Sequence, residues 1–268
     1  MSGAIAVNLI LSIAIGITLA TSALILIRYS NLKLTGTDPL PLATFMAILF
    51  TSGLDVGLIM FPLTEFPIYE SEPAYGFTNA LAIEFGFWGF LVWAFYFLTT
   101  FYFCVVEPKL QLFEIGWIKL ANNAVIITTC AFTGFLFLTY LPTYVEGISD
   151  SLRYGLVALV VLLAVLSSTD IRYIKWLSLG SCALFFGLVL LLWAASGAGI
   201  TGLAESASNI GGYFPNIHRF ATPITDHHAF YLFWWFAWSI MIGQFVARFV
   251  GGIPTWQLLL ALLIIPSI

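Results

Sequence analysis

Charged residues are scarce in this sequence. Of its 268 residues, nine are Lys or Arg and thirteen are Asp or Glu, so that 8% are charged, whereas soluble domains carry roughly 25%. Hydrophobic residues make up 61% of the chain, and the mean hydropathy is +1.02. The formal net charge of −4 offers no basic patch, which argues against a nucleic-acid partner. The composition indicates an integral membrane protein.

The signatures of enzymes and cofactor proteins are also missing. The three cysteines, Cys104, Cys130 and Cys182, lie in apolar segments without a CxxC spacing, so we interpret them as small hydrophobic residues rather than as a disulfide or metal framework. No nucleophile elbow, P-loop or dinucleotide fingerprint occurs. We therefore predict no enzyme activity, no cofactor, and no catalytic or metal-binding residues.

All three histidines, His218, His227 and His228, lie in or beside one long polar connection. Ligation of haem within a membrane would need histidines inside the helices. Asp226 with His227 and His228 could hold a metal ion at the surface, but the pattern favours an ordinary solvated loop end.

Long hydrophobic runs are what the sequence has in abundance. A spanning helix needs about 20 apolar residues, and seven apolar blocks approach or exceed that length: 5–27, 41–63, 78–105, 119–141, 153–168, 174–197 and 229–249. A weaker block, 253–268, follows them. The first block lacks a basic flank before it and is too long for a signal-peptide core. We predict an all-α integral membrane protein with about seven transmembrane helices and a short C-terminal apolar helix.

The basic residues indicate an orientation. Alternate connections hold Arg28, Lys33, Lys109, Lys119, Arg172, Lys175 and Arg248, while the opposite set holds Arg153 and Arg219. Because basic residues concentrate on the cytoplasmic side, the first set is predicted to be cytoplasmic and the N-terminus to lie on the non-cytoplasmic side.

The second block contains a carboxylate at membrane depth. In TSGLDVGL (51–58), Gly53 and Gly57 flank Asp55. An acidic group there needs protein, water or a counter-ion around it, and glycines permit local unwinding. We predict an unwound helix with a cation or proton site at Gly53, Asp55 and Gly57; the alternative is a small-residue packing seam with a protonated Asp55. Glu84, nearer the outer end of the third block, is expected to be solvated at the boundary.

Two apolar blocks concentrate large aromatic residues. At 100° per residue, one sector of roughly 140° holds Trp88, Trp93 and Tyr96. A second sector of roughly 100° holds Trp234, Trp235 and Trp238. If the two converge, their ring faces form a box that attracts a quaternary ammonium group. The alternative is ordinary packing in a chain that is 17% aromatic.

Three motifs at these positions resemble those of the betaine/choline/carnitine transporter family. The first is WWFAWSIMIGQFVAR (234–248), which ends in Gly243, Phe245, Ala247 and Arg248. The second is a W-G-x-x-x-W-A-x-Y stretch at 88–96, and the third is the glycine-rich segment with Glu65 after it. They occur in the order and at the separations typical of that family.

The resemblance implies a fold and a division of the chain. It implies a leucine-transporter type of bundle, in which two inverted five-helix repeats hold the substrate at the membrane midplane. On that map the chain is one transmembrane domain, 1–268, with a partial inverted-repeat bundle. Its parts are a peripheral helix (5–27), the first repeat (41–197), an external connection with a surface helix (199–228), and the truncated start of the second repeat (229–268).

The sequence also departs from the family pattern. Family members are about twice as long, so most of the second repeat and the helix that completes the sodium site have no counterpart here. Asp55 stands where sodium-coupled members have glycine, and Pro62 replaces another glycine. We therefore expect a half-length transporter that binds a trimethylammonium solute, such as betaine, choline or carnitine, and needs a second polypeptide or a second copy. The alternative is a degenerate relative that serves as an accessory subunit of a membrane complex.

Overall fold

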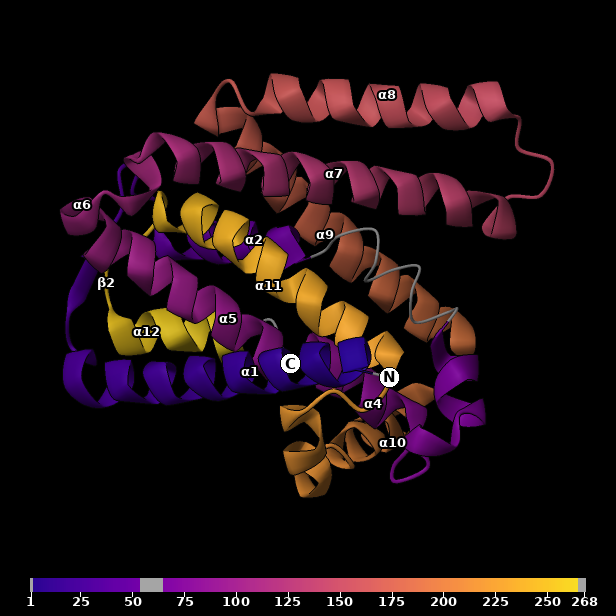
Figure 1. Ribbon diagram of the computed structural model, residues 1–268. Helices are drawn as coiled ribbons and strands as arrows, with labels where there is room; N and C mark the ends of the chain where they lie inside the picture. Colours follow the sequence, from indigo (N-terminus) through magenta and orange to yellow (C-terminus); the bar gives the residue numbers. More distant parts are fainter. Residues whose placement is uncertain (1, 54–64, 265–268) are drawn as a thin grey trace.

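The computed structural model describes residues 2–53 and 65–264, and most of these are helical (Figure 1). Among them, six helices are long and apolar enough to cross a membrane: Ile5–Tyr29, Ala80–Leu110, Gly116–Thr143, Asp150–Ser167, Ile171–Ser196 and Asp226–Ala247. They correspond to six of the seven predicted blocks. The described part of the remaining block is a shorter apolar helix, Leu42–Thr51, and Thr255–Ile264 is the short C-terminal one. The predicted all-α integral membrane architecture is confirmed.

The α-helices and strands follow one another as α1 (Ser2–Tyr29), β1 (Lys33–Thr35), α2 (Leu42–Gly53), α4 (Ala80–Trp88), α5 (Phe90–Phe101), α6 (Glu107–Leu110), α7 (Gly116–Tyr144), α8 (Asp150–Ser167), α9 (Ile171–Ser196), α10 (Gly199–Gly211), α11 (Asp226–Ala247), β2 (Gly251–Pro254) and α12 (Thr255–Leu259). Residues 65–71 form a further short helical segment. Short 3₁₀-helical segments are η1 (Pro73–Tyr75), η3 (Leu112–Glu114) and η4 (Phe214–Ala221), and short π-helical segments are η2 (Tyr102–Val106) and η5 (Leu260–Ile264).

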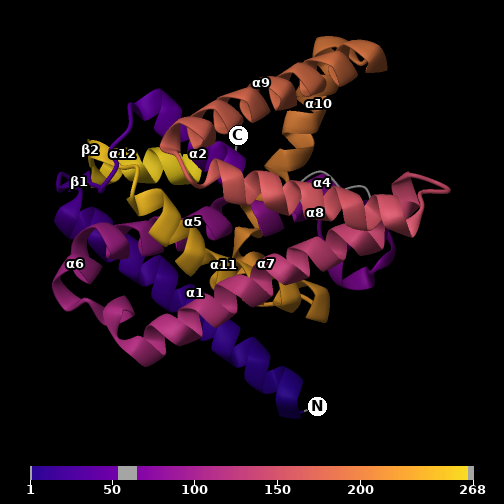
Figure 2. The ribbon, with the colours of Figure 1, turned by 90° about the horizontal axis from the view of Figure 1, so that it is seen from above.

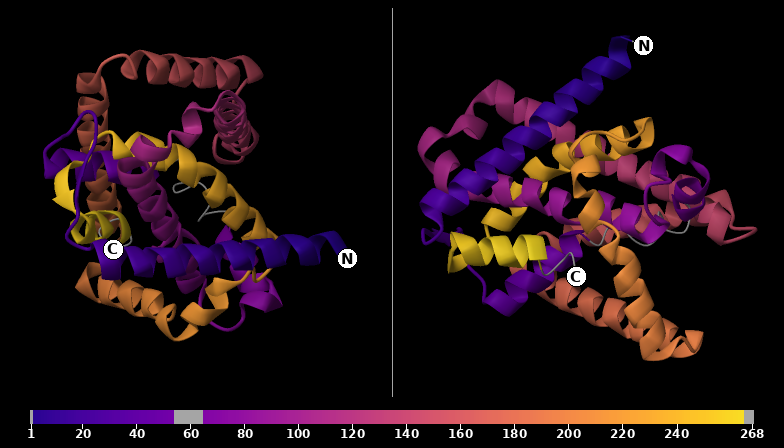
Figure 3. Two further views of the ribbon diagram at one scale, coloured as in Figure 1. Left: turned by 60° about the vertical axis from the view of Figure 1, so that its left-hand side comes forward. Right: turned by 90° about the horizontal axis from the view of Figure 1, so that it is seen from below.

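The core lies between α5 and α11, which pack against each other along most of their length (Figures 1 and 3). Helices α1, α4 and α12 cover other sides of α5, and α2 and α7 contact α11. Gly243 of α11 permits this close approach, because a Cβ atom there would lie 2.4 Å from the Thr99 Oγ1 atom of α5. The two helices that carry the aromatic motifs are thus direct neighbours.

Helices α7, α8 and α9 form the outer part of the bundle (Figures 2 and 3). Almost none of their apolar residues are buried within the chain; Leu162 and Leu190, for example, are exposed. A helix that is apolar on its outer face needs lipid or further protein around it. These helices therefore present their surface to a membrane or to another polypeptide.

A two-stranded antiparallel sheet fastens the chain after α1 to the chain after α11. Lys33 pairs with Pro254 across the two strands, and the Arg248 Nη2 atom lies 3.2 Å from Asp38 Oδ2. Lys33 and Arg248 therefore lie at one end of the bundle, as their common place in the charge pattern suggests.

Gly89 interrupts the third apolar block between α4 and α5. Its backbone (φ −89°, ψ −136°) leaves the helical conformation, and a Cβ atom there would lie 2.4 Å from the Phe85 carbonyl oxygen. The sector that groups Trp88 with Trp93 and Tyr96 was calculated at 100° per residue for a continuous helix. The assumption of a continuous helix was wrong. The direction of Trp88 relative to Trp93 is set by this break.

Candidate functional site

Aromatic rings of α4, α5 and α11 meet in one group, which we call the aromatic cluster: Trp88, Trp93, Tyr96, Tyr231 and Trp235. The ring centroids of Trp88 and Trp235 are 4.7 Å apart, edge to face, and those of Trp88 and Tyr231 are 5.7 Å apart. Tyr96 lies 5.3 Å from Trp93 and 6.5 Å from Trp235. The aromatic cluster connects both tryptophan motifs.

Two of the six predicted aromatic residues lie elsewhere. Trp234 and Trp238 stack on each other with centroids 6.4 Å apart, and Trp234 lies 5.0 Å from Phe132 of α7. Positions four apart differ by only 40° around a helix, whereas neighbours differ by 100°. Trp234 and Trp238 therefore share the face toward α7, while Trp235 faces α4 and α5.

Tyr231 was missed in the sequence analysis. It precedes Trp235 by four residues, so the same helical spacing places both on one face of α11. Its ring contacts Trp88, and its hydroxyl donates a hydrogen bond to Glu65 Oε1. The i, i+4 relation to Trp235 was the signal that could have identified it.

The aromatic cluster offers ring faces in an apolar setting. Trp93, Tyr96 and Trp235 are buried, and no described residue accepts a hydrogen bond from the indole N–H of Trp93 or Trp235. Ring faces attract a quaternary ammonium group by about 0.5–2 kcal/mol per contact, and desolvation favours the upper end of this range.

A second group, the polar cluster, adjoins the first and consists of Glu65, Tyr69, Glu84, His227 and Tyr231. Glu65 is 2% exposed. Its Oε2 atom accepts a hydrogen bond of 2.8 Å from the Tyr69 hydroxyl, its Oε1 atom accepts one from Tyr231, and the His227 Nε2 atom lies 3.4 Å from Oε1. Burial and the neighbouring carboxyl groups of Glu84 and Glu65 raise the pKa of Tyr69 above its ordinary value, so its hydroxyl keeps the proton that it donates.

Two expectations for polar residues here were wrong. Glu84 is 8% exposed and packed inside the bundle rather than solvated at its boundary, because it lies on the face of α4 that meets residues 65–71 and α11. His228 is not part of a solvated loop end. It is 1% exposed and stacks on Phe87 with ring centroids 4.2 Å apart, because α11 begins at Asp226 and its first turn already packs on α4.

Thr225 fixes the start of α11. Its Oγ1 atom accepts a hydrogen bond of 3.2 Å from the backbone N–H of His228, as helix-capping threonines do, and lies 2.6 Å from the Tyr75 hydroxyl. The His228 Nδ1 atom accepts a hydrogen bond from the backbone N–H of Ile224. These contacts hold the first turn of α11, and with it His227 and Tyr231, against residues 65–75.

The predicted unwound helix lies largely outside the described residues. Gly53 is the last residue of α2, and Asp55 and Gly57 lie outside the described residues. Within the described chain, no group of three or more His, Cys, Asp or Glu residues is arranged to hold a metal ion.

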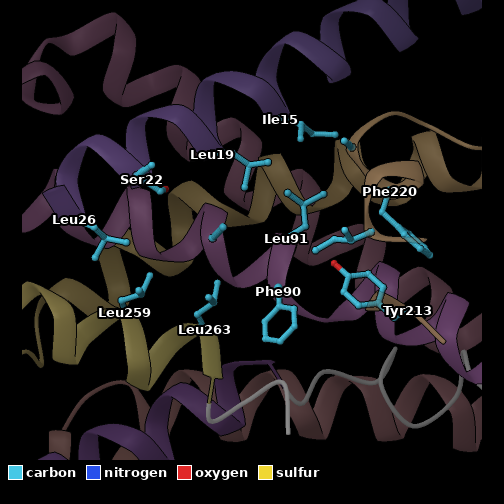
Figure 4. Close-up of a pocket in the computed structure, with 14 residues that line it drawn as sticks. Ile15, Leu19, Ser22, Leu26, Phe90, Leu91, Tyr213, Phe220, Leu259 and Leu263 are labelled. Atoms are coloured by element: carbon cyan, nitrogen blue, oxygen red, sulfur yellow. The ribbon is translucent and has the colours of Figure 1, made fainter. Parts of the chain in front are cut away.

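An apolar pocket of about 300 Å³ lies between α1, α5, η4 and α12 (Figure 4). Its walls include Leu19, Phe90, Tyr213 and Leu263, and none of the described residues that line it is charged. The pocket borders α5 but presents none of the tryptophans of the aromatic cluster. Its chemistry suits an apolar group rather than a charged solute.

Comparison with known proteins points to transporters, although no protein-family model matches the chain. The chain is 25% identical to the glycine betaine transporter OpuD of Bacillus subtilis, over 97% of this chain and 59% of that protein. It is 26% identical to glycine betaine transporter 1 of Vibrio parahaemolyticus, over 92% and 56%, and 24% identical to an uncharacterized transporter of Mycobacterium tuberculosis, over 90% and 49%. The chain spans about half the length of the curated relatives it matches. The predicted resemblance to betaine transporters is confirmed.

Proposed function

We propose that this chain is part of a membrane transporter for a trimethylammonium osmolyte, with glycine betaine as the first solute to test. Relatives named glycine betaine transporters align over nearly all of it, and its helices have the length and composition of membrane spans. In the proposed role, the aromatic cluster contacts the ammonium group of the solute.

The observation that carries this proposal is the contact between Trp88 and Trp235. The two residues belong to separate motifs on separate helices, and both motifs resemble those of one transporter family. Packing alone would not require tryptophans from both motifs to meet around Tyr96 and Tyr231. A cation-binding box does require such convergence, since several ring faces must reach one ammonium group.

We also propose that a second polypeptide or a second copy of this chain completes the transport unit. Apolar surface of α7, α8 and α9 is exposed, and part of it is available for protein contact as well as for lipid. The site residues Gly53, Asp55 and Gly57 keep their proposed role in binding a cation or proton.

Binding of radiolabelled glycine betaine tests the function, measured on the chain extracted gently together with the copies or polypeptides that accompany it and placed in lipid nanodiscs. We expect saturable binding that unlabelled glycine betaine and choline displace and that glycine, which lacks the three methyl groups, does not. Absence of saturable binding, or equal displacement by glycine, would contradict a trimethylammonium site and favour the accessory-subunit alternative.

A further inference from the structure

The carboxyl group of Glu84 is buried without the hydrogen bonds that a carboxylate needs. Glu84 is 8% exposed, and within the described chain no donor reaches either of its oxygen atoms with hydrogen-bond geometry. Its carboxyl group nevertheless lies close enough to Tyr69 and Glu65 to interact with both. An ionised carboxylate buried in this way costs several kcal/mol.

Glu65, its neighbour, is in the opposite situation. It accepts hydrogen bonds from the hydroxyls of Tyr69 and Tyr231, and His227 lies 3.4 Å away. Hydrogen bonds of this kind favour the charged form of a carboxyl group. When two carboxyl groups share one buried site and only one is supplied with donors, the other retains a proton.

Among the described residues, no Lys or Arg side chain takes the place of a proton in neutralising the pair of Glu65 and Glu84. The titratable groups that interact with the pair are Tyr69, Tyr75, His227 and Tyr231. Behind them, His228 adjoins His227 and Tyr140 of α7 adjoins Tyr231. No Lys or Arg of the described chain forms an ion pair with Glu65 or Glu84. His227 is the one imidazole placed beside Glu65, and it lies on the side of Glu65 that Tyr231 also contacts.

From this geometry we propose that Glu84 is a proton-binding site in the wall beside the aromatic cluster. A proton on Glu84 turns an acceptor into a donor beside Glu65 and Tyr69, the two groups with which its carboxyl group interacts, and Tyr69 itself donates to Glu65. One proton thereby removes the charge of one of the two neighbouring carboxyl groups. Glu84 precedes Trp88 by one helical turn on α4, so the presence of this proton sets the charge next to the proposed box.

Infrared spectroscopy of the chain in nanodiscs tests this site without reference to any solute. A protonated carboxyl group absorbs in a region separate from ionised carboxylates. We expect a band for one protonated carboxyl group at neutral pH to be lost in Glu84→Gln, which mimics the protonated group in shape, and to be retained in the control Glu72→Gln, at an exposed glutamate of the same region.

Tyr69→Phe supplies an independent readout should Glu84→Gln fail to fold. Removal of the Tyr69 hydroxyl takes away a polar neighbour of the Glu84 carboxyl group, so the band is expected to move to higher frequency; glycine betaine binding is measured separately. A band that survives Glu84→Gln unchanged, or one that does not move in Tyr69→Phe, would overturn the proposal. If the unmodified chain does not bind glycine betaine, the proposed function is contradicted, but the proposal of a proton site at Glu84 still stands.

Discussion

The Trp235 ring of α11 meets the Trp88 ring of α4 edge to face, with centroids 4.7 Å apart. Trp234, the preceding residue, faces α7 instead and contacts Phe132. Two neighbouring indoles in one motif therefore have different surroundings. This difference provides a matched pair for testing the aromatic cluster.

The approach of α11 to α5 depends on Gly243. Replacement of Gly243 by Ala places a methyl group 2.4 Å from Thr99 Oγ1, and overpacking of this kind costs about 1–3 kcal/mol. We expect a clear loss of thermal stability in detergent. Gly187→Ala on α9 is the control, because a Cβ atom there meets nothing within 4 Å. Equal stability of the two variants would contradict the close packing of α5 and α11.

The approximate positions of the helices could be predicted from sequence because membrane spans require long apolar runs. The break at Gly89 could not, because a glycine within an apolar run is compatible with a continuous helix. The burial of Glu84 and His228 also escaped prediction: each lies near the end of a span, and only tertiary contacts with residues 65–71 and with Phe87 decide whether such a position is solvated.

The aromatic site was predictable only in part, because tertiary packing also decides which helix each ring meets. Spacing identified which residues face the same way, yet a sector of 100° is wide enough to point at two different neighbouring helices. Trp235 contacts α4 and Trp234 contacts α7, and the choice follows from where those helices pack. The resemblance to a transporter family drew attention to Trp88 and Trp235, whereas Tyr231, one helical turn before Trp235, was identified from its contacts.

Glu65 is expected to stabilise the contact between residues 65–71 and α11. Glu65→Ala removes the acceptor of the Tyr69 hydrogen bond, and a buried hydroxyl without its partner costs about 1–3 kcal/mol. Thermal unfolding should show this loss, with a smaller effect for Glu65→Gln, which retains an acceptor oxygen. Glu205→Ala at an exposed site of α10 should change stability by less than about 0.5 kcal/mol.

A double-mutant cycle isolates the pair. If Glu65 acts through Tyr69, Tyr69→Phe should cost much less in the Glu65→Ala background than in the unmodified chain. Strict additivity of the two substitutions would show that the hydrogen bond contributes nothing to stability.

The sheet between β1 and β2 predicts a specific crosslink. Lys33 and Pro254 are paired across the strands, and paired residues lie about 4.5–5.5 Å apart between Cα atoms, within reach of a disulfide. In a variant without the three native cysteines, Lys33→Cys with Pro254→Cys should crosslink on mild oxidation. Lys33→Cys with Ile200→Cys should not, since Ile200 is on α10, far from the sheet (Figure 2). The reverse pattern would refute this register.

Native mass spectrometry after gentle extraction tests the proposed assembly. A species heavier than the 29.6 kDa polypeptide, containing a second copy or another polypeptide, is expected to carry the binding of glycine betaine. A monomer that binds and transports glycine betaine alone would contradict the requirement for a partner.

The central claim is that the aromatic cluster binds a trimethylammonium solute, and the affinity of glycine betaine for Trp235→Ala and Trp234→Ala tests it most directly. One cation–π contact is worth about 0.5–2 kcal/mol, so loss of the Trp235 ring should weaken binding about 2- to 30-fold. The Trp234 ring faces α7, so its loss should leave the affinity close to that of the unmodified chain. Equal affinities for Trp235→Ala and the unmodified chain, or a larger loss for Trp234→Ala, would contradict the account.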